Sequence, residues 1–203
     1  MKYKYTCIDE KEILDIYEKD TLFNEWYKIV RKILHSTEFQ KRRLFRHHEF
    51  ESVWNHSIKV SFNSFKYAKK NGYNEYNCAI AGLLHDFYTK AWQDSIELTN
   101  LDDKYRENFI NPKRKKLLQK HGFTHPLEAL ENSRIYFKKY LNKDIENAIV
   151  THMFPLSLFT KYKLPNNKTS YVITYIDKKV SMNVISSVKG ILKYSGVTKK
   201  ELN

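Results

Sequence analysis

An adjacent histidine and aspartate, His85 and Asp86, end an apolar stretch of the sequence. The stretch begins at Cys78 and reads Cys-Ala-Ile-Ala-Gly-Leu-Leu before the pair. A run of small and aliphatic residues is typical of a fully buried element, so both polar side chains are expected in the interior. Burying a carboxylate beside an imidazole is costly unless something compensates it. A bound cation would do so, and a hydrogen bond between the two side chains at the end of a core helix is the alternative.

More residues of ligand type stand at long spacings on apolar segments of the chain. They are His56, His125, His152 and Asp177. Any one of them alone would more often be a core residue than a ligand. Six such residues on five segments, each on a buried stripe or at a helix end, favour a metal site. Nitrogen and carboxylate ligands without thiolate suit iron, manganese, zinc or a similar divalent ion.

The order of these residues resembles the signature of the HD-domain superfamily of metal-dependent phosphohydrolases. That signature is His…His-Asp…Asp, with two further histidines in the members that bind two metals. The residues that flank each ligand position also match, and the resemblance covers roughly residues 39 to 195. The matching segments are His56-Ser-Ile-Lys-Val, Ala81-Gly-Leu-Leu-His-Asp86, His125-Pro-Leu-Glu-Ala, Ile149-Val-Thr-His152 and Ile176-Asp177-Lys. The chain is thus similar to the bimetallic type, among the symmetrical dinucleoside tetraphosphate hydrolase-like and uncharacterised HD phosphohydrolases.

The resemblance implies two divalent metal ions that share one carboxylate. The ligands of the first would be His56, His85, Asp86 and Asp177. The ligands of the second would be Asp86, His125 and His152. Iron or manganese is the first expectation, with zinc, magnesium, cobalt and nickel as alternatives. Asp86 and His85 would be the central catalytic residues and a metal-bridging hydroxide the nucleophile, because a pair of cations polarises phosphoryl oxygens and activates a shared water.

Four further residues are expected to contact substrate. Arg46 and His48 lie in a basic stretch before the first ligand, and similar HD phosphohydrolases carry a histidine there, which His48 matches better than His47. A solvated basic helix end is the alternative for this stretch. Some relatives carry a lysine three residues after the HD aspartate, but here the lysine, Lys90, stands one residue later. His121 is expected as an extra ligand or a phosphate contact.

Together these features predict an enzyme that cleaves a phosphoester or phosphoanhydride of a small nucleotide or dinucleotide. An HD nuclease or phosphodiesterase acting on a polynucleotide or cyclic nucleotide is the alternative, and a non-enzymatic, metal-stabilised binding module is a third hypothesis. The net charge of +13, from 36 Lys and Arg against 23 Asp and Glu, favours anionic partners. Because the basic residues are dispersed and no aromatic-interleaved basic stripe is evident, a small nucleotide is favoured over nucleic acid.

The elements that must position these residues are predicted to be helices. We expect one all-α domain over residues 1–203, an HD-domain helical bundle (39–195) with an N-terminal helical extension (1–38). Apolar periodicity predicts helices over residues 9–19, 23–35, 56–70, 75–92, 143–153 and 169–194, and another beginning near Pro126. Pro126 would occupy the first turn of that helix with His125 at its cap. Residues 95–120 are expected to form a helix or lid over the cleft.

Two packing details accompany this fold. Ala79, Ala81 and Gly82 are small enough to let a neighbouring backbone approach closely. Large apolar residues of the extension, such as Phe23 and Trp26, are expected to pack into the bundle, and a homodimer contact is the alternative.

The sequence offers no sign of a membrane span or a disulfide framework. No apolar segment approaches the roughly 20 residues that cross a bilayer, and only two cysteines are present. A cytoplasmic protein with no membrane partner is expected.

Overall fold

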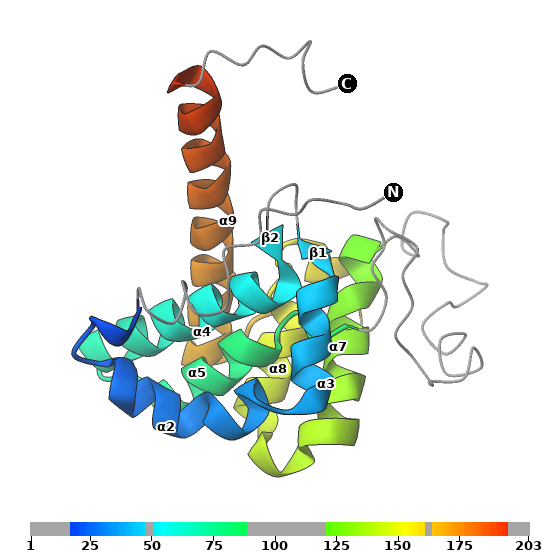
Figure 1. Ribbon diagram of the computed structural model, residues 1–203. Helices are drawn as coiled ribbons and strands as arrows, with labels where there is room; N and C mark the ends of the chain where they lie inside the picture. Colours follow the sequence, from blue (N-terminus) through cyan, green and yellow to red (C-terminus); the bar gives the residue numbers. More distant parts are fainter. Residues whose placement is uncertain (1–16, 48–50, 89–120, 161–163, 195–203) are drawn as a thin grey trace.

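The protein is a bundle of helices, as the sequence predicts. The computed structural model describes residues 17–47, 51–88, 121–160 and 164–194, with side chains except those of Arg46, Glu51 and residues 183–194. The main helices are α2 (Phe23–Leu34), α3 (Thr37–Gln40), α4 (Val53–Lys70), α5 (Glu75–Leu84), α7 (His121–Phe137), α8 (Lys143–Thr151) and α9 (Lys168–Tyr194) (Figure 1). The short 3-10 helices are η1 (Lys41–Leu44), η3 (Lys138–Tyr140) and η4 (Leu156–Phe159). The helices predicted over residues 9–19 and the lid over 95–120 fall largely or wholly outside the described residues.

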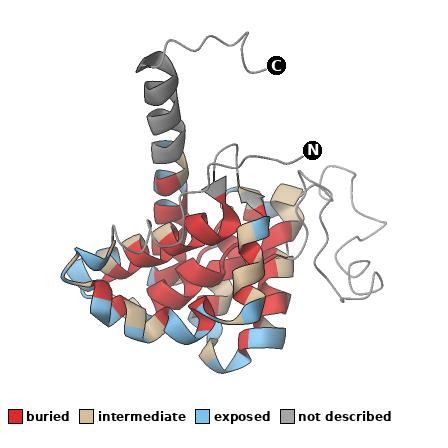
Figure 2. Ribbon diagram, viewed as in Figure 1, coloured by how far each residue is buried: buried red, intermediate tan, exposed pale blue. Residues whose placement is uncertain are grey.

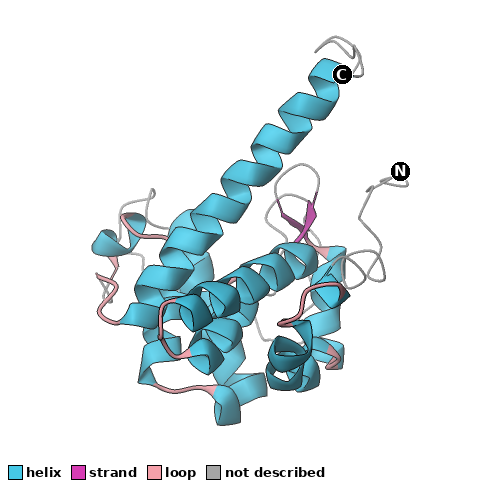
Figure 3. Ribbon diagram, turned by 90° about the vertical axis from the view of Figure 1, so that its left-hand side faces the viewer, coloured by secondary structure: helices cyan, strands magenta, loops and turns pink. Residues whose placement is uncertain are grey.

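A short β-ladder is the one extended feature among the described residues. Strands β1 (Arg46–His47) and β2 (Glu51–Ser52) pair antiparallel, with His47 opposite Glu51 (Figure 3). Ser52 then becomes the N-cap of α4, because its hydroxyl accepts a hydrogen bond from the backbone N–H of Asn55. The ladder therefore delivers the chain directly into the first turn of the helix that carries His56.

Helices α4 and α5 cross at very short range. A Cβ atom at Gly82 of α5 would lie 2.7 Å from the Cα and 2.9 Å from the backbone N of Ser61 in α4. The Ser61 hydroxyl donates to the carbonyl of Ala79 at 2.7 Å, and the indole N–H of Trp26 donates to the Ser61 Oγ at 2.9 Å. The expectation that small residues here admit a neighbouring backbone is confirmed.

The N-terminal helix α2 is part of the core. Trp26, Val30, Ile33 and Leu34 are fully buried against the bundle, and Phe23 is nearly so. Figure 2 shows the buried side of α2 facing α5, with exposed positions on the outer side. The core-packing interpretation of Phe23 and Trp26 is therefore confirmed, and no helix in the described ranges is long and apolar enough to cross a bilayer.

Two helix boundaries were predicted wrongly. Helix α5 ends at Leu84 rather than near residue 92, because the N–H of Phe87 bonds the Leu84 carbonyl and that of Tyr88 bonds the Asp86 carbonyl, which turns the chain. The predicted helix was too long because Phe87 and Tyr88 are apolar and continue the buried stripe.

Helix α7 is the second case, since its described part already begins at His121 and Pro126 lies inside the helix. His125 is consequently a helical residue rather than a cap. Pro126 lacks the N–H that would otherwise donate to the Gly122 carbonyl one turn earlier, and its ring crowds that carbonyl, so the packing around α7 must offset this local cost.

Candidate metal centre

The six predicted ligands converge in one buried cluster. His56 lies in the first turn of α4, His85 caps α5 with Asp86 directly after it, His125 is on α7, His152 caps α8 and Asp177 is in the middle of α9. None of the six is more than 8% exposed. The cluster therefore joins residues that are up to 121 positions apart in the sequence.

Three of these residues form a first trio, His56, His85 and Asp177. The Nε2 atom of His56 lies 2.9 Å from Asp177 Oδ1, and the Nε2 atom of His85 lies 3.6 Å from the same oxygen. The donor atoms of the trio all lie within 4.8 Å of one another, a spacing that could hold a metal ion. The carboxylate on α9 thus faces two imidazoles, one from α4 and one from the end of α5.

A second trio consists of Asp86, His125 and His152. The two imidazole Nε2 atoms are 3.0 Å apart, and they lie 3.3 Å and 3.4 Å from Asp86 Oδ1. The other oxygen, Asp86 Oδ2, faces the Nε2 atom of His85 at 3.5 Å. One carboxylate therefore contacts both trios, each through a different oxygen.

Backbone carbonyl groups orient three of the imidazoles. The Nδ1 atom of His85 lies 2.8 Å from the Gly82 carbonyl, that of His125 lies 2.8 Å from the His121 carbonyl, and that of His152 lies 2.7 Å from the Ile149 carbonyl. Only a protonated Nδ1 can donate to a carbonyl oxygen, so each neutral ring presents a bare Nε2 atom to the cluster. This is the arrangement that metal-binding histidines usually show.

The facing nitrogen atoms fit a bound cation. When both rings donate through Nδ1, the Nε2 lone pairs of His125 and His152 point at each other and at a carboxylate oxygen, and these contacts are repulsive unless a positive charge lies between them. Asp86 Oδ1 and His85 Nε2 are also buried with no hydrogen-bond partner in the described part of the chain. Imidazole and carboxylate donors suit first-row divalent metals. The residues present therefore fit a metal ion.

The carboxylates of the cluster are held in the charged form that binds metals. Burial raises the pKa of Asp86, but the charge of His85 and the contacts of His125 and His152 lower it by more, so that the pKa falls well below the usual range. Burial likewise raises the pKa of Asp177, and its contacts with His56 and His85 outweigh this effect. Both side chains are thus anionic at neutral pH.

The two imidazoles of the second trio differ in their proton affinity. Burial lowers the pKa of each ring. Contact with Asp86 more than offsets this for His125, whose pKa is raised, whereas the pKa of His152 stays lowered because His85 and His125 also lie close to it.

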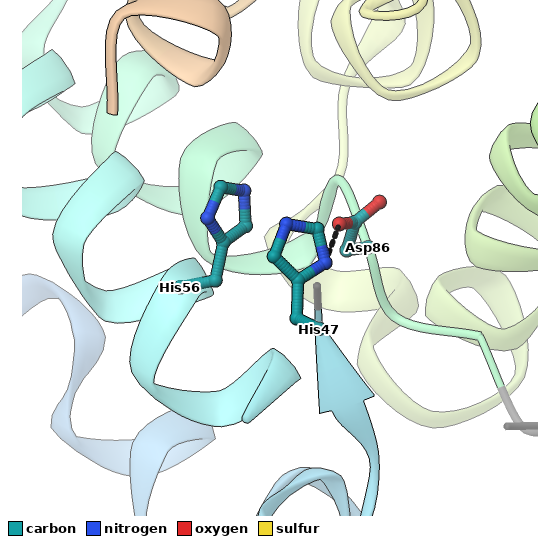
Figure 4. A group of neighbouring side chains, drawn as sticks. All are labelled: His47, His56 and Asp86. Carbon is teal, nitrogen blue, oxygen red and sulfur yellow. Dashed lines mark ion pairs between the residues drawn. The ribbon is translucent and has the colours of Figure 1, made fainter. Parts of the chain in front are cut away.

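His47 is a cluster residue that the sequence interpretation passed over. Its ring stacks on that of His56 with centroids 3.8 Å apart, and its Nδ1 atom lies 3.6 Å from Asp86 Oδ2 (Figure 4). His47, His56 and Asp86 form a third group whose spacing could hold a metal ion. The neighbouring His48, which was preferred from the sequence, falls outside the described residues, as do Lys90 and the side chain of Arg46. Strand alternation could have found His47 had the two-residue β1 been foreseen.

Part of the basic stretch before α4 serves packing. The guanidinium carbon of Arg42 lies 3.7 Å from the centre of the Phe87 ring, and this side chain is only 1% exposed. The guanidinium carbon of Arg43 lies 4.0 Å from the centre of the Trp54 ring. These two contacts are cation–π interactions that support the segment leading to His47.

His121 lies beside the second trio but is not one of the clustered donors. Its ring stacks on that of His125 with centroids 4.6 Å apart. Burial, aided by the nearby charge of His125, lowers the pKa of His121 to about 3. A neutral imidazole is therefore available at the edge of the cluster.

A cavity of about 990 Å³ opens onto the cluster. Its polar lining includes His47, Asp86, His121 and Asp177, together with Lys178 of α9. Its apolar lining is Tyr88, Met153, Phe154, Pro155, Leu156 and Met182. The cavity thus combines a group of potential metal ligands, one lysine and a broad apolar wall.

Comparison with known proteins supports a relationship to HD domains over part of the chain. A family model described as the HDOD domain, which is HD-related but a distinct family, matches residues 23–98. The matched stretch contains His47, His56, His85 and Asp86, and the ligands contributed by α7, α8 and α9 lie beyond it. No curated protein and no solved structure matches the chain. Residues 23–98 are therefore similar to the HDOD domain, and that segment supplies the His-Asp pair at the centre of the cluster.

Proposed function

We propose that the protein is a metal-dependent phosphohydrolase whose two trios hold a pair of divalent metal ions. The observation that carries the proposal is the Asp86 carboxylate, whose two oxygens face different trios at 3.3 to 3.5 Å. Asp86 would thus contribute one ligand atom to each metal, so that both could act on one phosphate. Bound there, the metal pair would polarise the phosphoryl oxygens and make an attacking water more acidic.

The protein residues around the pair would bind and orient the substrate. Lys178 lines the cavity and its ammonium group donates to the Phe154 carbonyl, where its positive charge would attract phosphate oxygens. His121, neutral because of its low pKa, would donate or accept one hydrogen bond without adding charge. The apolar wall from Met153 to Leu156 would receive the uncharged part of the substrate. A cavity of about 990 Å³ is large enough for a nucleotide or dinucleotide.

Iron or manganese is the metal that we propose first, with zinc, magnesium, cobalt or nickel as alternatives. All of them accept imidazole and carboxylate ligands to differing degrees, and geometry and availability decide among them in the cell. The substrate proposed is a small phosphorylated molecule, a nucleotide above all.

The test combines metal analysis with a hydrolysis assay. Purified protein should contain about two first-row metal ions per chain and should hydrolyse at least one member of a panel of nucleotides and dinucleoside polyphosphates. Asp86→Ala should lose both metals and all hydrolysis, whereas His121→Ala should only weaken hydrolysis. Asp20→Ala is the matched control, because Asp20 pairs with Lys66 outside the ligand cluster.

Two results would contradict the proposal in different ways. Full metal content in Asp86→Ala would show that this carboxylate does not bridge two metals. Full metal content in the unaltered protein with no hydrolysis of any panel member would favour a metal-stabilised binding module.

A further inference from the structure

The exposed side of α9 carries a row of lysines and tyrosines. Its members follow the 3- and 4-residue spacing of one helix face: Lys168, Tyr171, Tyr175, Lys178 and Lys179. Tyr171 is 58% exposed and Tyr175 is 52% exposed. The opposite side of the same helix, with Val172, Ile173 and Ile176, is buried in the core. The row therefore faces solvent on the side of α9 opposite the core.

Tyrosines from α4 and the turn after it extend this row into a surface. Tyr67 of α4 is 37% exposed, and its ring centroid lies 5.9 Å from that of Tyr175 and 6.4 Å from that of Tyr73. Helices α4 and α9 pack side by side at this point (Figures 1 and 3). Two hollows of about 470 and 620 Å³ flank Tyr67. We call the two hollows and the rings between them the tyrosine–lysine surface.

Lysines line both hollows of this surface. Six lysines line the two hollows, namely Lys66, Lys69, Lys70, Lys168, Lys178 and Lys179, and no aspartate or glutamate is among the described lining residues. Lys66 and Lys69 pair with acidic residues of the N-terminal segment. By contrast, the ammonium groups of Lys168 and Lys179 lie 5.4 Å and 5.8 Å from the ring centres of Tyr73 and Tyr175. Positive charge and exposed aromatic rings are thus combined in one place.

We propose that the tyrosine–lysine surface binds single-stranded nucleic acid. Exposed aromatic rings offer faces on which unpaired bases stack, and neighbouring lysines neutralise the phosphates that connect those bases. In a duplex the base faces are covered by their neighbours, so the surface should prefer single strands. The sequence shows no aromatic-interleaved basic stripe, because Tyr67 and Lys70 on α4 meet the row on α9 only after the chain folds.

The surface also adjoins the candidate metal centre. Phe154 and Lys178 line both the 620 Å³ hollow and the cavity that opens onto the metal ligands. A strand bound along the surface would therefore lead toward the cluster. Cleavage of that strand would rest on the proposed phosphohydrolase function, whereas binding of the strand does not.

Binding can be measured without hydrolysis by using Asp86→Ala. The probe is a fluorescent oligothymidylate of about 12 nucleotides, a length within the range that single-strand binding sites cover, and the readout is anisotropy at several salt concentrations. Tyr175→Ala should weaken binding about tenfold, as expected for the loss of one stacked base, and Tyr175→Phe should keep the ring and the affinity. Lys168→Ala should lower the slope of log K against log salt by about 0.7, the value for one neutralised phosphate of a single strand.

A second lysine–tyrosine pair on η3 provides the matched control. The Lys139 ammonium lies 5.1 Å from the Tyr140 ring centre, and neither residue lines the two hollows. Lys139→Ala should therefore change neither the affinity nor the salt slope. Equal weakening by Lys139→Ala and Lys168→Ala would overturn the proposal, because binding would then reflect net charge alone.

Two further results would also overturn it. One is duplex binding as tight as single-strand binding. The other is a concentration-dependent dimer that Tyr175→Ala converts to monomer, since a second copy of the chain would then cover the surface.

Discussion

Gly82→Ala tests how tightly the fold and the candidate metal centre are linked. The added Cβ would lie 2.7 Å from the Cα and 2.9 Å from the backbone N of Ser61, and neither backbone atom can rotate away. Helices α4 and α5 must therefore separate. Separation weakens the hydrogen bond from the Ser61 hydroxyl to the Ala79 carbonyl and the one from the Trp26 indole to Ser61. It also displaces the Gly82 carbonyl that orients His85.

The expected change in the free energy of unfolding follows from these contacts. Overpacking costs about 1–3 kcal/mol, and the two weakened hydrogen bonds cost about 1 kcal/mol each. Replacing a helical glycine by alanine returns about 1 kcal/mol. We therefore expect a net destabilisation of about 2–4 kcal/mol by the sum of these terms. Since His56 is on α4 and His85 ends α5, metal content should fall as well.

Urea denaturation followed by circular dichroism measures the first effect, and metal analysis of the purified variant measures the second. Gly122→Ala is the matched control, because the nearest atoms to its Cβ would be the Leu156 Cδ1 atom at 3.7 Å and the Met153 Cε atom at 4.0 Å. It should leave stability unchanged or slightly raised. A Gly82→Ala variant as stable as the unaltered protein would refute the reasoning, since the close crossing would then be unimportant.

Three further outcomes are expected. Asp177→Ala should lose one metal of about two while Asp86→Ala loses both, because Asp177 contacts only the first trio; metal analysis that shows equal losses would contradict the two-trio arrangement. A chelator should lower the free energy of unfolding measured by urea denaturation, and added metal should restore it. The restored free energy should be about 2.7 kcal/mol when free metal is at 100 times its Kd. An unchanged free energy of unfolding would mean that no metal is bound in the native state. Burial raises the pKa of the Cys78 thiol to about 12. In a Cys7→Ser variant, which leaves Cys78 as the one cysteine, a thiol reagent at pH 8 should therefore react about a thousandfold more slowly with native than with unfolded protein. Fast labelling of native protein would show that α5 opens readily.

The helices with strong one-sided periodicity could be predicted from the sequence. The long α9 is the clearest case, because Ile173, Ile176 and Val180 lie on one buried stripe. The end of α5 at Leu84 and the helical path of α7 before Pro126 could not be predicted. Apolar Phe87 and Tyr88 extend the stripe beyond the end of α5, and Pro126 imitates a helix start inside α7. Local propensity carries no information on how the surrounding helices end these segments.

The six ligand-type residues could be identified because polar groups on apolar stripes are conspicuous in a sequence. Their convergence is now a property of the described structure, and their roles as ligands stay a prediction. His47 could not be distinguished from His48, because the choice depends on which neighbour points inward from a two-residue strand. The tyrosine–lysine surface was missed for a different reason. It is assembled from α4 and α9, whose members are about 100 positions apart, so that no window of the sequence contains both halves.

The position of Asp177 on α9 has a consequence for how the protein matures. During synthesis His56 and His85 emerge early, but the oxygen that lies within 3.6 Å of both belongs to a residue made 25 positions after His152, the last of the histidine ligands. The first trio therefore cannot assemble until α9 has been made and has docked against α4. Insertion of metal into that trio would report completion of the fold, and a nascent or truncated chain that lacks α9 would be distinguishable by its failure to retain the ion.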